Sequence, residues 1–445
     1  MNAAAGLCCR FESLHFGSLC NSTPSPLSRK ICLPFAVGPN SPSADLATRL
    51  PQQKGSFSFF TRDRTTFATT TPRKVLQERS GPVAAAFGVD LLPPPIDRDL
   101  QELQEELGAE FSPEGVVVTF NNDADALEAS KSGFAVVDLS HFGRLRVYDD
   151  DRIRFLHNQS TADFNLLKPG QGGDTVFVTN TARTIDLVTA YIKESSVLLV
   201  TSPSQRRELL PYLDKFIFFA DKVKLQDVTD QCFMLALVGP QSSQVLEDLR
   251  AGDLVGKPYG THAMFDFQGS PVMIAVGSGL ATDGYTVIAD AAAAGDFWKT
   301  LMQQGGVPMG ARAWERLRIL QGRPVPGAEL TPDYNPLEAG LWNTISLTKG
   351  CYIGQETIAR LITYNGVKQH LWGIQLSEAV EPGTVITLDD AKVGKVTSVT
   401  ETESGFFALG YIRSKVCSEP GLTVHVGNAV GKVVEIPFVR RTLDA

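Results

Sequence analysis

Apolar and polar positions alternate in short runs along the chain, and these runs predict a mixture of strands and helices. Leu100, Leu103 and Leu107 recur at helical spacing, which predicts a short charged helix from residue 97 to residue 108. Strand-like and helical runs then follow one another with short connections. We expect strands at residues 116–120, 135–138, 143–147, 175–178, 185–192 and 196–201, and helices at residues 149–159 and 204–214.

A second series of elements starts near Val223, and the pattern changes again at Leu371. From Leu371 to Phe438, short strands are separated by turn signals such as Pro382-Gly383, which predicts a small closed or nearly closed β-barrel. The fold class that we expect is therefore α+β. Before the barrel, we expect strands at residues 232–238, 264–267, 272–275 and 285–289, and helices at residues 241–249, 291–304 and 313–321.

The length of the chain and these changes of pattern predict several structural units, since a domain usually holds about 100–200 residues. A proline-rich linker at residues 78–96 precedes them. The units that we expect are a first α+β unit at residues 97–222, completed by residues 311–370, a second α+β unit at 223–310, and a C-terminal β-barrel at 371–445.

The first 77 residues have the composition of a transit peptide. They hold nine basic and three acidic residues among many serines and threonines, and prolines interrupt every apolar run that a secretory signal needs. The threonine-rich stretch at residues 65–71 favours import into a chloroplast, with the stroma as the expected location, over import into a mitochondrion. A disordered tail without a targeting function also fits this composition.

The rest of the chain is acidic, with a formal net charge of −14 against −8 for all 445 residues. An acidic surface repels nucleic acid, and no basic stripe with interleaved aromatic residues indicates a binding site for it. No apolar run approaches the roughly 20 residues that cross a membrane. We therefore expect neither a nucleic acid nor a membrane as a partner, and we expect a monomer.

Three of the seven cysteines lie outside the first 77 residues: Cys232, Cys351 and Cys417. They are far apart and form no Cys-x-x-Cys pair, so the sequence indicates neither a zinc site nor an iron–sulphur cluster of the chain's own. We expect no bound metal. We also expect no disulfide framework, because a core of this size does not need covalent crosslinks.

The run from Lys349 to Glu356, Lys-Gly-Cys-Tyr-Ile-Gly-Gln-Glu, is the most specific stretch of the chain. Gly350 and Gly354 permit sharp turns and close backbone approaches, so that Cys351 can stand on a turned loop. Lys349 and the loop amides favour the thiolate over the thiol. A lone cysteine is otherwise most often a small buried apolar residue, which is the alternative interpretation.

These eight residues agree at every position with the signature of the YgfZ family, a branch of the glycine-cleavage T-protein (GcvT) superfamily of tetrahydrofolate-binding proteins. The resemblance continues through residues 334–341 and 357–360, and more loosely covers Phe111 to the C-terminus. Within this family, the chain is most similar to a plant chloroplast member of cyanobacterial type. The resemblance implies two ferredoxin-like α+β units and a C-terminal barrel around a central funnel, which accepts tetrahydrofolate or another reduced folate as the cofactor.

The same resemblance implies a folate-dependent accessory protein for the assembly or repair of iron–sulphur clusters, with client or carrier proteins as partners. In this hypothesis Cys351 is a reactive thiol activated by Lys349, Gln355 orients a ligand, and Glu356 pairs with Arg360 one helical turn later. Two alternatives stay open. One is a tetrahydrofolate-dependent transfer of an aminomethyl or methyl group on a small amine, and the other is a non-catalytic folate sensor or scaffold.

The match to the T-protein itself bears on the first alternative. In that enzyme the second member of an aspartate pair places a catalytic carboxylate near the reacting nitrogen of folate. Asp186 matches the first member here, and Leu187 takes the place of the second. A leucine side chain neither accepts a proton nor stabilises a cation, so Leu187 disfavours aminomethyl transfer. A shift of the alignment by one residue would return the role to Asp186.

Four further folate contacts are implied by the resemblance in the first half of the chain. Asp138 and His141 lie in a segment that is similar to a funnel-lining turn of the T-protein, and Asp163 and Asn180 match funnel-facing positions. His141 can donate to the ligand or titrate near neutral pH. The alternatives are a histidine satisfied by its own turn and side chains that only cap turns.

The remaining folate contacts lie in the second half. Two glutamates of the T-protein are missing, which predicts weaker or repositioned folate binding unless Asp283, close to Tyr285, or another acid replaces the pterin-binding carboxylate. Arg318 is retained, and it meets either the glutamate tail of folate or an internal carboxylate. A charge in contact with solvent on the surface of a helix is the alternative for Arg318.

Overall fold

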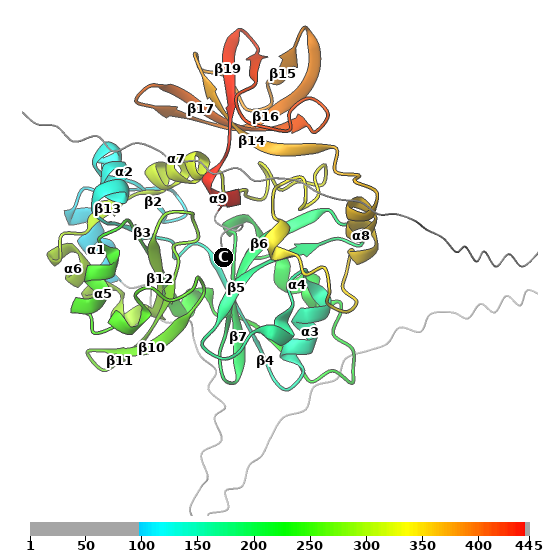
Figure 1. Cartoon of the computed structure of the whole chain (residues 1–445). Coiled ribbons are helices and arrows are strands. Elements are labelled where there is room, and N and C mark those ends of the chain that lie inside the picture. Colours follow the sequence, from blue (N-terminus) through cyan, green and yellow to red (C-terminus); the bar gives the residue numbers. More distant parts are fainter. Residues whose placement is uncertain (1–97, 441–445) are drawn as a thin grey trace, which may run out of the picture. The chain divides into compact units, whose positions relative to one another are not determined.

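Two β-sheets, their helices and a closed β-barrel form the part of the chain that the computed structural model describes, residues 98–440 (Figure 1). This architecture agrees with the α+β class and the C-terminal barrel predicted from the sequence. The transit peptide that we expect at residues 1–77 and the linker at residues 78–96 lie outside the described residues.

The first sheet has six strands in the order β10-β11-β12-β9-β3-β13. Helices cover both of its faces, because its central strands are apolar on both sides: Leu237 of β9 packs in a cluster with Trp298, and Ala236 packs in another with Trp314. The strands are β3 (Ala135–Asp138), β9 (Cys232–Val238), β10 (His262–Phe267), β11 (Ser270–Val276), β12 (Gly284–Asp290) and β13 (Val307–Met309).

The second sheet has five antiparallel strands in the order β5-β6-β7-β4-β8. One of its faces packs on α3 and α4 through a cluster that includes Leu145, Phe155, Phe177 and Leu213. The strands are β4 (Gly143–Tyr148), β5 (Gly172–Val178), β6 (Thr184–Ile192), β7 (Ser196–Thr201) and β8 (Lys224–Asp227).

The division between the α+β units differs from the predicted one at residues 222 and 223. β3 precedes β4 in the chain, but it pairs with β9 in the six-stranded sheet. β8 follows residue 222, but it pairs with β4 in the five-stranded sheet. Apolar patterning identifies a strand but not its partner, and neighbouring strands in the chain pair only about two-thirds of the time. The two units are therefore interleaved in sequence.

The predicted helices are present with boundaries that differ by a few residues, and α2, α8 and α9 lie outside the ranges expected for helices. The sequence of α2, DADALEASKS, is weakly apolar, and its buried residues are Ala126, Ala129 and Ser130, so the pattern gives little signal. The helices are α1 (Arg98–Glu106), α2 (Asp123–Ser132), α3 (Arg152–Gln159), α4 (Leu209–Asp214), α5 (Ser242–Asp248), α6 (Ala294–Gln303), α7 (Ala311–Gln321), α8 (Gln355–Thr363) and α9 (Pro437–Arg440).

The C-terminal barrel closes through the strand order β14-β17-β16-β15-β18-β19. Aliphatic side chains such as Ile374, Ile386, Val396 and Ile412 fill its interior. Its strands are β14 (Gln369–Leu376), β15 (Val385–Leu388), β16 (Ala391–Thr402), β17 (Gly405–Arg413), β18 (Thr423–Val426) and β19 (Ala429–Val434). A short two-stranded sheet of β1 (Glu110–Phe111) and β2 (Val117–Thr119) lies outside both larger sheets.

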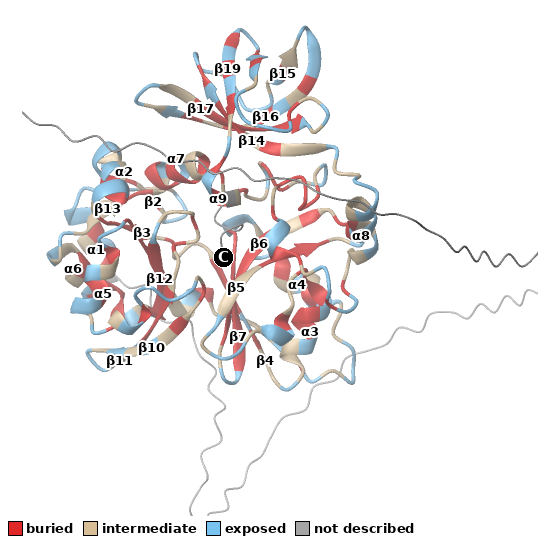
Figure 2. Cartoon of the chain, in the orientation of Figure 1, coloured by how far each residue is buried: buried red, intermediate tan, exposed pale blue. Residues whose placement is uncertain are grey.

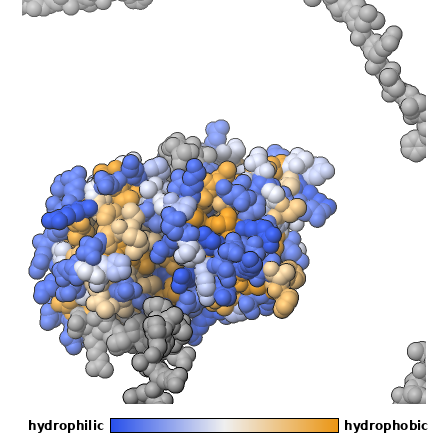
Figure 3. Space-filling model, turned by 90° about the horizontal axis from the view of Figure 1, so that it is seen from below, coloured by the Kyte–Doolittle hydropathy of each residue, from blue (hydrophilic) through white to orange (hydrophobic). Residues whose placement is uncertain are grey.

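An apolar cluster joins the five-stranded sheet to the barrel. It contains Val176 of β5, Leu187 of β6, Tyr411 of β17 and Phe438 of α9, each of them almost completely buried. Buried residues follow the strands and the inner faces of the helices (Figure 2). On the face drawn in Figure 3, hydrophilic side chains predominate and apolar ones lie in separate groups. No helix between residues 98 and 440 is long and apolar enough to span a membrane.

Candidate active site

Cys351 is an exposed free thiol on the loop that precedes α8. Gly354, the residue before α8, has a φ of +81°, and a Cβ at this position would lie 2.7 Å from the carbonyl oxygen of Thr179. Only glycine combines this backbone angle with such a close approach to the turn between β5 and β6. The loop that carries Cys351 is therefore pressed against the five-stranded sheet at Gly354.

Lys349 holds the other side of the loop. Its side chain is buried, and Nζ donates hydrogen bonds to the carbonyl oxygens of His157, Ser160 and Ala162, at and just beyond the C-terminal end of α3. A cation at this end of a helix binds carbonyl groups that the helix itself leaves without partners. Burial lowers the pKa of Lys349 to about 8. All three ammonium hydrogens are thus used to anchor the loop.

This arrangement changes the role that we expected for Lys349. We predicted that its charge activates Cys351, whereas the structure directs its ammonium group to backbone carbonyls on α3 and the residues after it. The same side chain also lies over the ring of Tyr352, with Nζ 4.8 Å from the ring centroid. Lys349 is therefore a structural anchor of the Cys351 loop.

Backbone hydrogen bonds fix the same loop at two more places. The Ile353 amide donates to the carbonyl oxygen of Asn158, and the Ser346 amide donates to that of Thr161. The Thr161 hydroxyl in turn donates to the Thr344 carbonyl oxygen at 2.7 Å. The loop is thus bound along much of its length to the segment that follows α3, and Cys351 remains exposed between these attachments.

His157 lies beside Gly350, the residue before Cys351, and the sequence did not indicate it. Its side chain is nine-tenths buried, and a Cβ on Gly350 would lie 3.9 Å from its Nε2 atom. Its Nδ1 atom lies 3.1 Å from the Asp163 carboxylate oxygen Oδ1. Burial and the nearby Lys349 ammonium lower the pKa of His157 below 6.5, while Asp163 acts in the opposite direction.

Asp163 is the one expected folate contact that the structure brings to the Cys351 loop. Its Oδ1 atom accepts a hydrogen bond from the Asn165 amide and caps the short 3₁₀ helix at Phe164–Leu166, which is the turn-capping alternative. The same oxygen faces His157. No sequence signal predicts that His157 and Asp163 lie together, because the pattern of α3 shows which residues are apolar but not which side chains they meet in the fold.

The other two motif residues, Gln355 and Glu356, lie in the first turn of α8. Glu356 and Arg360 form the predicted ion pair at i and i+4, on an exposed face. Such a pair adds little stability in water. Gln355 is partly buried at the start of the helix. Its predicted role in orienting a ligand stays a prediction.

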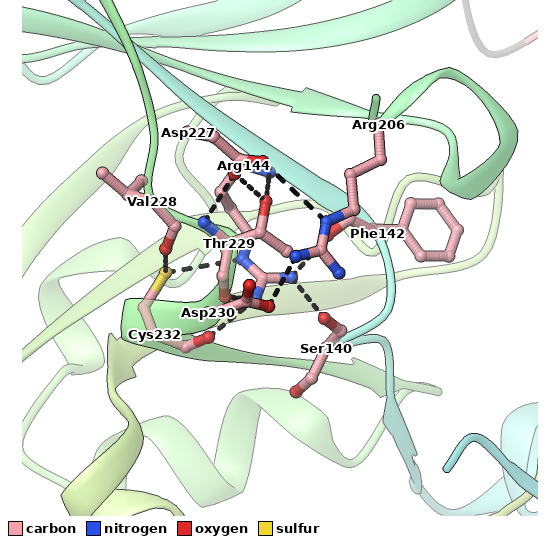
Figure 4. A network of polar contacts seen from close by, with 9 residues as sticks. All are labelled: Ser140, Phe142, Arg144, Arg206, Asp227, Val228, Thr229, Asp230 and Cys232. Carbon is pink, nitrogen blue, oxygen red and sulfur yellow. Dashed lines mark hydrogen bonds and ion pairs between the residues drawn. The ribbon is translucent and has the colours of Figure 1, made fainter. Parts of the chain in front are cut away.

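Asp138 and His141 lie at the end of β3, in a turn that Arg144 organises from within (Figure 4). Asp138 accepts hydrogen bonds from the Ser140 amide and from the Gln104 side chain. The buried Arg144 guanidinium donates to the Ser140 and Phe142 carbonyl oxygens at 2.8 and 2.6 Å. Burial lowers the pKa of His141. The turn is thus held by internal contacts.

Arg144 also connects this turn to β9. Its guanidinium donates to the carbonyl oxygens of Thr229 and Cys232, and Nε lies 3.4 Å from the Cys232 sulphur (Figure 4). Together with the bonds to the turn, these contacts use all five of its N–H groups. A buried guanidinium that is satisfied by carbonyl oxygens has no donor left for a ligand.

Asp186 is completely buried. Its carboxylate accepts hydrogen bonds from the Ser202 hydroxyl at 2.6 Å and from the Ser202 amide at 2.9 Å. Burial raises its pKa to about 6, although both hydrogen bonds favour the ionised form. Its neighbour Leu187 points into the apolar cluster with Tyr411 and Phe438. Neither side chain is therefore available as a surface-exposed base.

Arg318 binds internal carboxylates, which is one of the alternatives predicted for it. Its guanidinium donates to both oxygens of Glu315 and to Glu329, and also to the Arg323 carbonyl oxygen and the Ser398 hydroxyl. These contacts use all five N–H groups and tie α7 to β16 of the barrel. The glutamate tail of a folate would have to break them.

The last three expected contacts also lie apart from one another. Tyr285 is buried in the core of the six-stranded sheet, where its hydroxyl lies 3.0 Å from Ser243 Oγ, and Asp283 is exposed just before β12. Asn180 is exposed and lines a cavity of about 550 Å³ with Arg183 and Gln205. Among the cavities described between residues 98 and 440, none is lined by more than one of the eight expected contacts.

A larger cavity of about 1050 Å³ adjoins α8. Thr357 and Leu361 of α8 form part of its wall, and cations line it from the β5–β6 connection, from the start of β14 and from the end of β17: Arg183, Lys368, Arg413 and Lys415. Between residues 98 and 440, no group of three or more His, Cys, Asp or Glu side chains is arranged to hold a metal ion.

The arrangement around Cys351 favours chemistry at the thiol. The side chain is exposed, its loop is fixed by hydrogen bonds, and an imidazole edge lies beside the preceding glycine. Nucleophilic cysteines in enzymes combine these three features. The candidate active site thus consists of Cys351 with His157 and Asp163, anchored by Lys349.

Comparison with known proteins places this chain in a family. The GCVT N-terminal domain family matches residues 104–349. A chloroplastic protein of Arabidopsis thaliana that carries the name "putative transferase" is 51% identical over 355 residues, which cover 79% of this chain and 82% of the relative. The chain belongs to the GCVT family. The sequence resemblance to the GcvT superfamily is thereby confirmed.

More distant members of the GCVT family carry a defined enzyme name. The aminomethyltransferase of Bacillus subtilis is 26% identical over 358 residues, which cover 77% of this chain and 98% of the relative. The crystal structure of the glycine cleavage system aminomethyltransferase T from Bartonella henselae matches with a TM-score of 0.69 and 21% identity, over 77% of this chain and 98% of that one. This GCVT-family chain therefore has the aminomethyltransferase fold.

Proposed function

We propose that this GCVT-family protein is a folate-dependent accessory factor for the assembly or repair of iron–sulphur clusters and that it belongs to the YgfZ branch. The observation that carries the proposal is the exposed Cys351 thiol on a loop whose Lys349 is bound to three carbonyl oxygens of the α3 region. A loop fixed in this way presents the thiol to a partner without rearranging. The agreement of all eight residues 349–356 with the YgfZ signature supports the assignment to this branch.

In this proposal the Cys351 thiolate attacks a disulfide or persulfide of an iron–sulphur client or carrier protein. A new sulphur–sulphur bond to Cys351 forms, the existing sulphur–sulphur bond of the partner breaks, and the displaced sulphur leaves as a thiolate that takes up the proton of Cys351. Lys349 holds the loop while the bond exists, since its ammonium hydrogens are bound to carbonyl oxygens. Gln355, in the first turn of α8, orients the bound group. The ion pair of Glu356 with Arg360 keeps that turn helical.

A reduced folate, such as tetrahydrofolate, is the ligand that we propose, and membership of the GCVT family supports it. None of the cavities described between residues 98 and 440 is lined by more than one of the contacts expected from the resemblance, so we assign no step to the folate. An equilibrium titration of the full-length protein with tetrahydrofolate tests this part. Binding that is equal in the wild type and in Cys351→Ala would separate the ligand site from the thiol, and absence of binding would refute the folate part.

A one-carbon transferase acting on a small amine is the second candidate, favoured by the aminomethyltransferase relatives. Against it stands Leu187, which packs in an apolar cluster where the T-protein has its catalytic carboxylate. A steady-state assay with tetrahydrofolate and candidate amines decides between the two, because multiple turnover would favour the transferase. A non-catalytic sensor or scaffold is the third candidate.

The location that we propose is the chloroplast stroma, and the name of the Arabidopsis relative supports the chloroplast. A fluorescent protein fused behind residues 1–77 tests it, with a mitochondrial signal as the alternative outcome. We further propose that the protein acts as a monomer, without a nucleic acid or a membrane as a partner. The acidic charge of the chain supports the exclusion of nucleic acid.

Complementation tests the central role of Cys351. The full chain, its Cys351→Ala and Cys351→Ser variants, and the control Thr363→Ala are expressed in a host that lacks the corresponding activity, and iron–sulphur enzyme activities are measured. Thr363 is exposed at the end of the same helix, α8. We expect restoration by the wild type and the control only. Full restoration by Cys351→Ala would refute the proposal, and a lower melting temperature as the main effect would favour the scaffold.

A further inference from the structure

The imidazole of His157 is oriented by contacts on one side only. Its Nδ1 atom lies 3.1 Å from Asp163 Oδ1 and 3.1 Å from Asn165 Nδ2. Nδ1 cannot both donate to Asp163 and accept from the Asn165 amide. Because a carboxylate is the stronger partner, we assign the proton to Nδ1, with the Asn165 side-chain amide turned so that its oxygen faces the ring. The other ring nitrogen, Nε2, then carries a lone pair.

This lone pair faces the Cys351 loop. A Cβ on Gly350 would lie 3.9 Å from Nε2, and Cys351 is the next residue. The His157 side chain is nine-tenths buried, yet Nε2 has no hydrogen-bond partner among residues 98–440. A buried imidazole with one nitrogen bound to a carboxylate and the other directed at a thiol loop is the geometry of a general base.

We propose that His157 is the catalytic base that accepts the proton of the Cys351 thiol, and that Asp163 is the positioning residue that holds the imidazole in the required tautomer. This inference rests on the proposed function, in which Cys351 is the reacting thiol. It assigns the activation of the thiol to a histidine, in place of the lysine that precedes the cysteine in sequence.

The charges around His157 favour this role near neutral pH. Lys349 from the Cys351 loop and Asp163 from the segment after α3 are the charged groups that act on the imidazole. Burial and Lys349 lower the pKa of His157 and outweigh Asp163, so the ring is neutral and able to accept a proton at pH 7. When the proton arrives, the Asp163 carboxylate stabilises the imidazolium.

Alkylation of Cys351 by iodoacetamide measures this activation directly. The sulphur forms a bond to the carbon of the reagent, iodide leaves, and the thiol proton passes to His157 Nε2 and then to water. The rate is measured from pH 5 to pH 10 in the full-length chain by mass spectrometry of the peptide that contains Cys351. Peptides with Cys232 and Cys417 serve as internal references in the same sample.

We compare the wild type with His157→Asn and Asp163→Asn. The asparagine amide at position 157 can still donate toward Asp163, but it supplies no base. At pH 7 we expect Cys351 to react about tenfold more slowly in His157→Asn, with a smaller loss in Asp163→Asn. The difference should disappear near pH 10, where a cysteine thiol ionises without help. The reference cysteines should react equally in all three proteins.

Equal Cys351 rates at pH 7 in the wild type and a folded His157→Asn protein would overturn the inference. If that variant does not fold, the wild type alone decides: a base-assisted rate rises through the titration of His157, below pH 6.5, whereas an unassisted rate rises only near the ordinary thiol pKa of about 8.5. Complementation by Cys351→Ala is a separate readout, so failure of the proposed function and failure of the His157 assignment are distinguishable.

Discussion

Lys349 Nζ donates a hydrogen bond to the carbonyl oxygen of Ser160 at 2.7 Å, although 189 positions separate the two residues in sequence. Two further carbonyl oxygens, those of His157 and Ala162, complete the coordination of the same ammonium group. The contact fixes the loop of Cys351 to the end of α3. The most specific motif of the chain therefore owes its geometry to a helix from the other half of the sequence.

Replacement of Lys349 by methionine should destabilise the protein. The methionine keeps the apolar part of the side chain, but it leaves three buried carbonyl oxygens without their donor. We expect the free energy of unfolding to fall by about 2–4 kcal/mol, measured by urea denaturation. The control is Lys368→Met, because Lys368 is exposed and should change stability by less than about 0.5 kcal/mol. Equal effects of the two substitutions would contradict the anchoring role.

The two glycines of the motif should respond differently to alanine. Gly354 has a φ of +81°, and a Cβ there would lie 2.7 Å from the Thr179 carbonyl oxygen, whereas the nearest atom to a Cβ on Gly350 is 3.9 Å away. Gly354→Ala should lower the free energy of unfolding by about 2–3 kcal/mol, and Gly350→Ala by less than about 1 kcal/mol. Thermal melting of the pair checks the order, and a reversed order would exclude the described docking of the loop.

Asp186 should make the stability of the protein depend on pH. Its pKa is raised from 3.8 to about 6 in the folded state, so between these values the folded chain binds more protons than the unfolded chain. The free energy of unfolding then falls as the pH rises, by about 2.4 kcal/mol between pH 4 and pH 7 for this group. An Asp186→Asn variant keeps hydrogen bonds to Ser202 but does not titrate.

The measurement that checks this dependence is urea denaturation of both proteins at several pH values between 4 and 7. The difference in stability between Asp186→Asn and the wild type should grow in favour of the variant as the pH rises. A difference that stays constant over this range would show that the carboxyl group of Asp186 has the same pKa in the folded and unfolded chain.

Restoring the carboxylate of the T-protein at Leu187 should not restore its activity. Leu187 is 1% exposed and packs with Tyr411 and Phe438, so Leu187→Asp buries an unpaired carboxyl group in an apolar cluster. We expect a loss of about 4 kcal/mol in the free energy of unfolding and no aminomethyl transfer to tetrahydrofolate. Leu187→Met, of similar volume, should cost less than about 1.5 kcal/mol. A stable and active Leu187→Asp protein would contradict this packing.

Local sequence determined most of the strands and helices. The predicted boundaries of β3, β7 and β9 agree with the structure, because each strand is a short apolar run that ends at a polar residue or at a turn. The ion pair of Glu356 with Arg360 was also predictable, since the two residues lie one helical turn apart. The pairing of strands was not predictable from local sequence. β3 pairs with β9 and not with its chain neighbour β4, although β9 is distant in sequence.

The sequence by itself determined the α+β class, the barrel and Cys351 as the residue of interest, since these depend on short-range patterns and on one contiguous motif. Only the tertiary structure decided which side chains lie near the Cys351 loop. The ammonium group of Lys349, two residues before Cys351, binds carbonyl oxygens at the end of α3, while His157 and Asp163, almost 200 positions earlier, are brought to the loop. The physical reason is that a side chain interacts with what lies near it in space, and folding, not chain order, sets that distance.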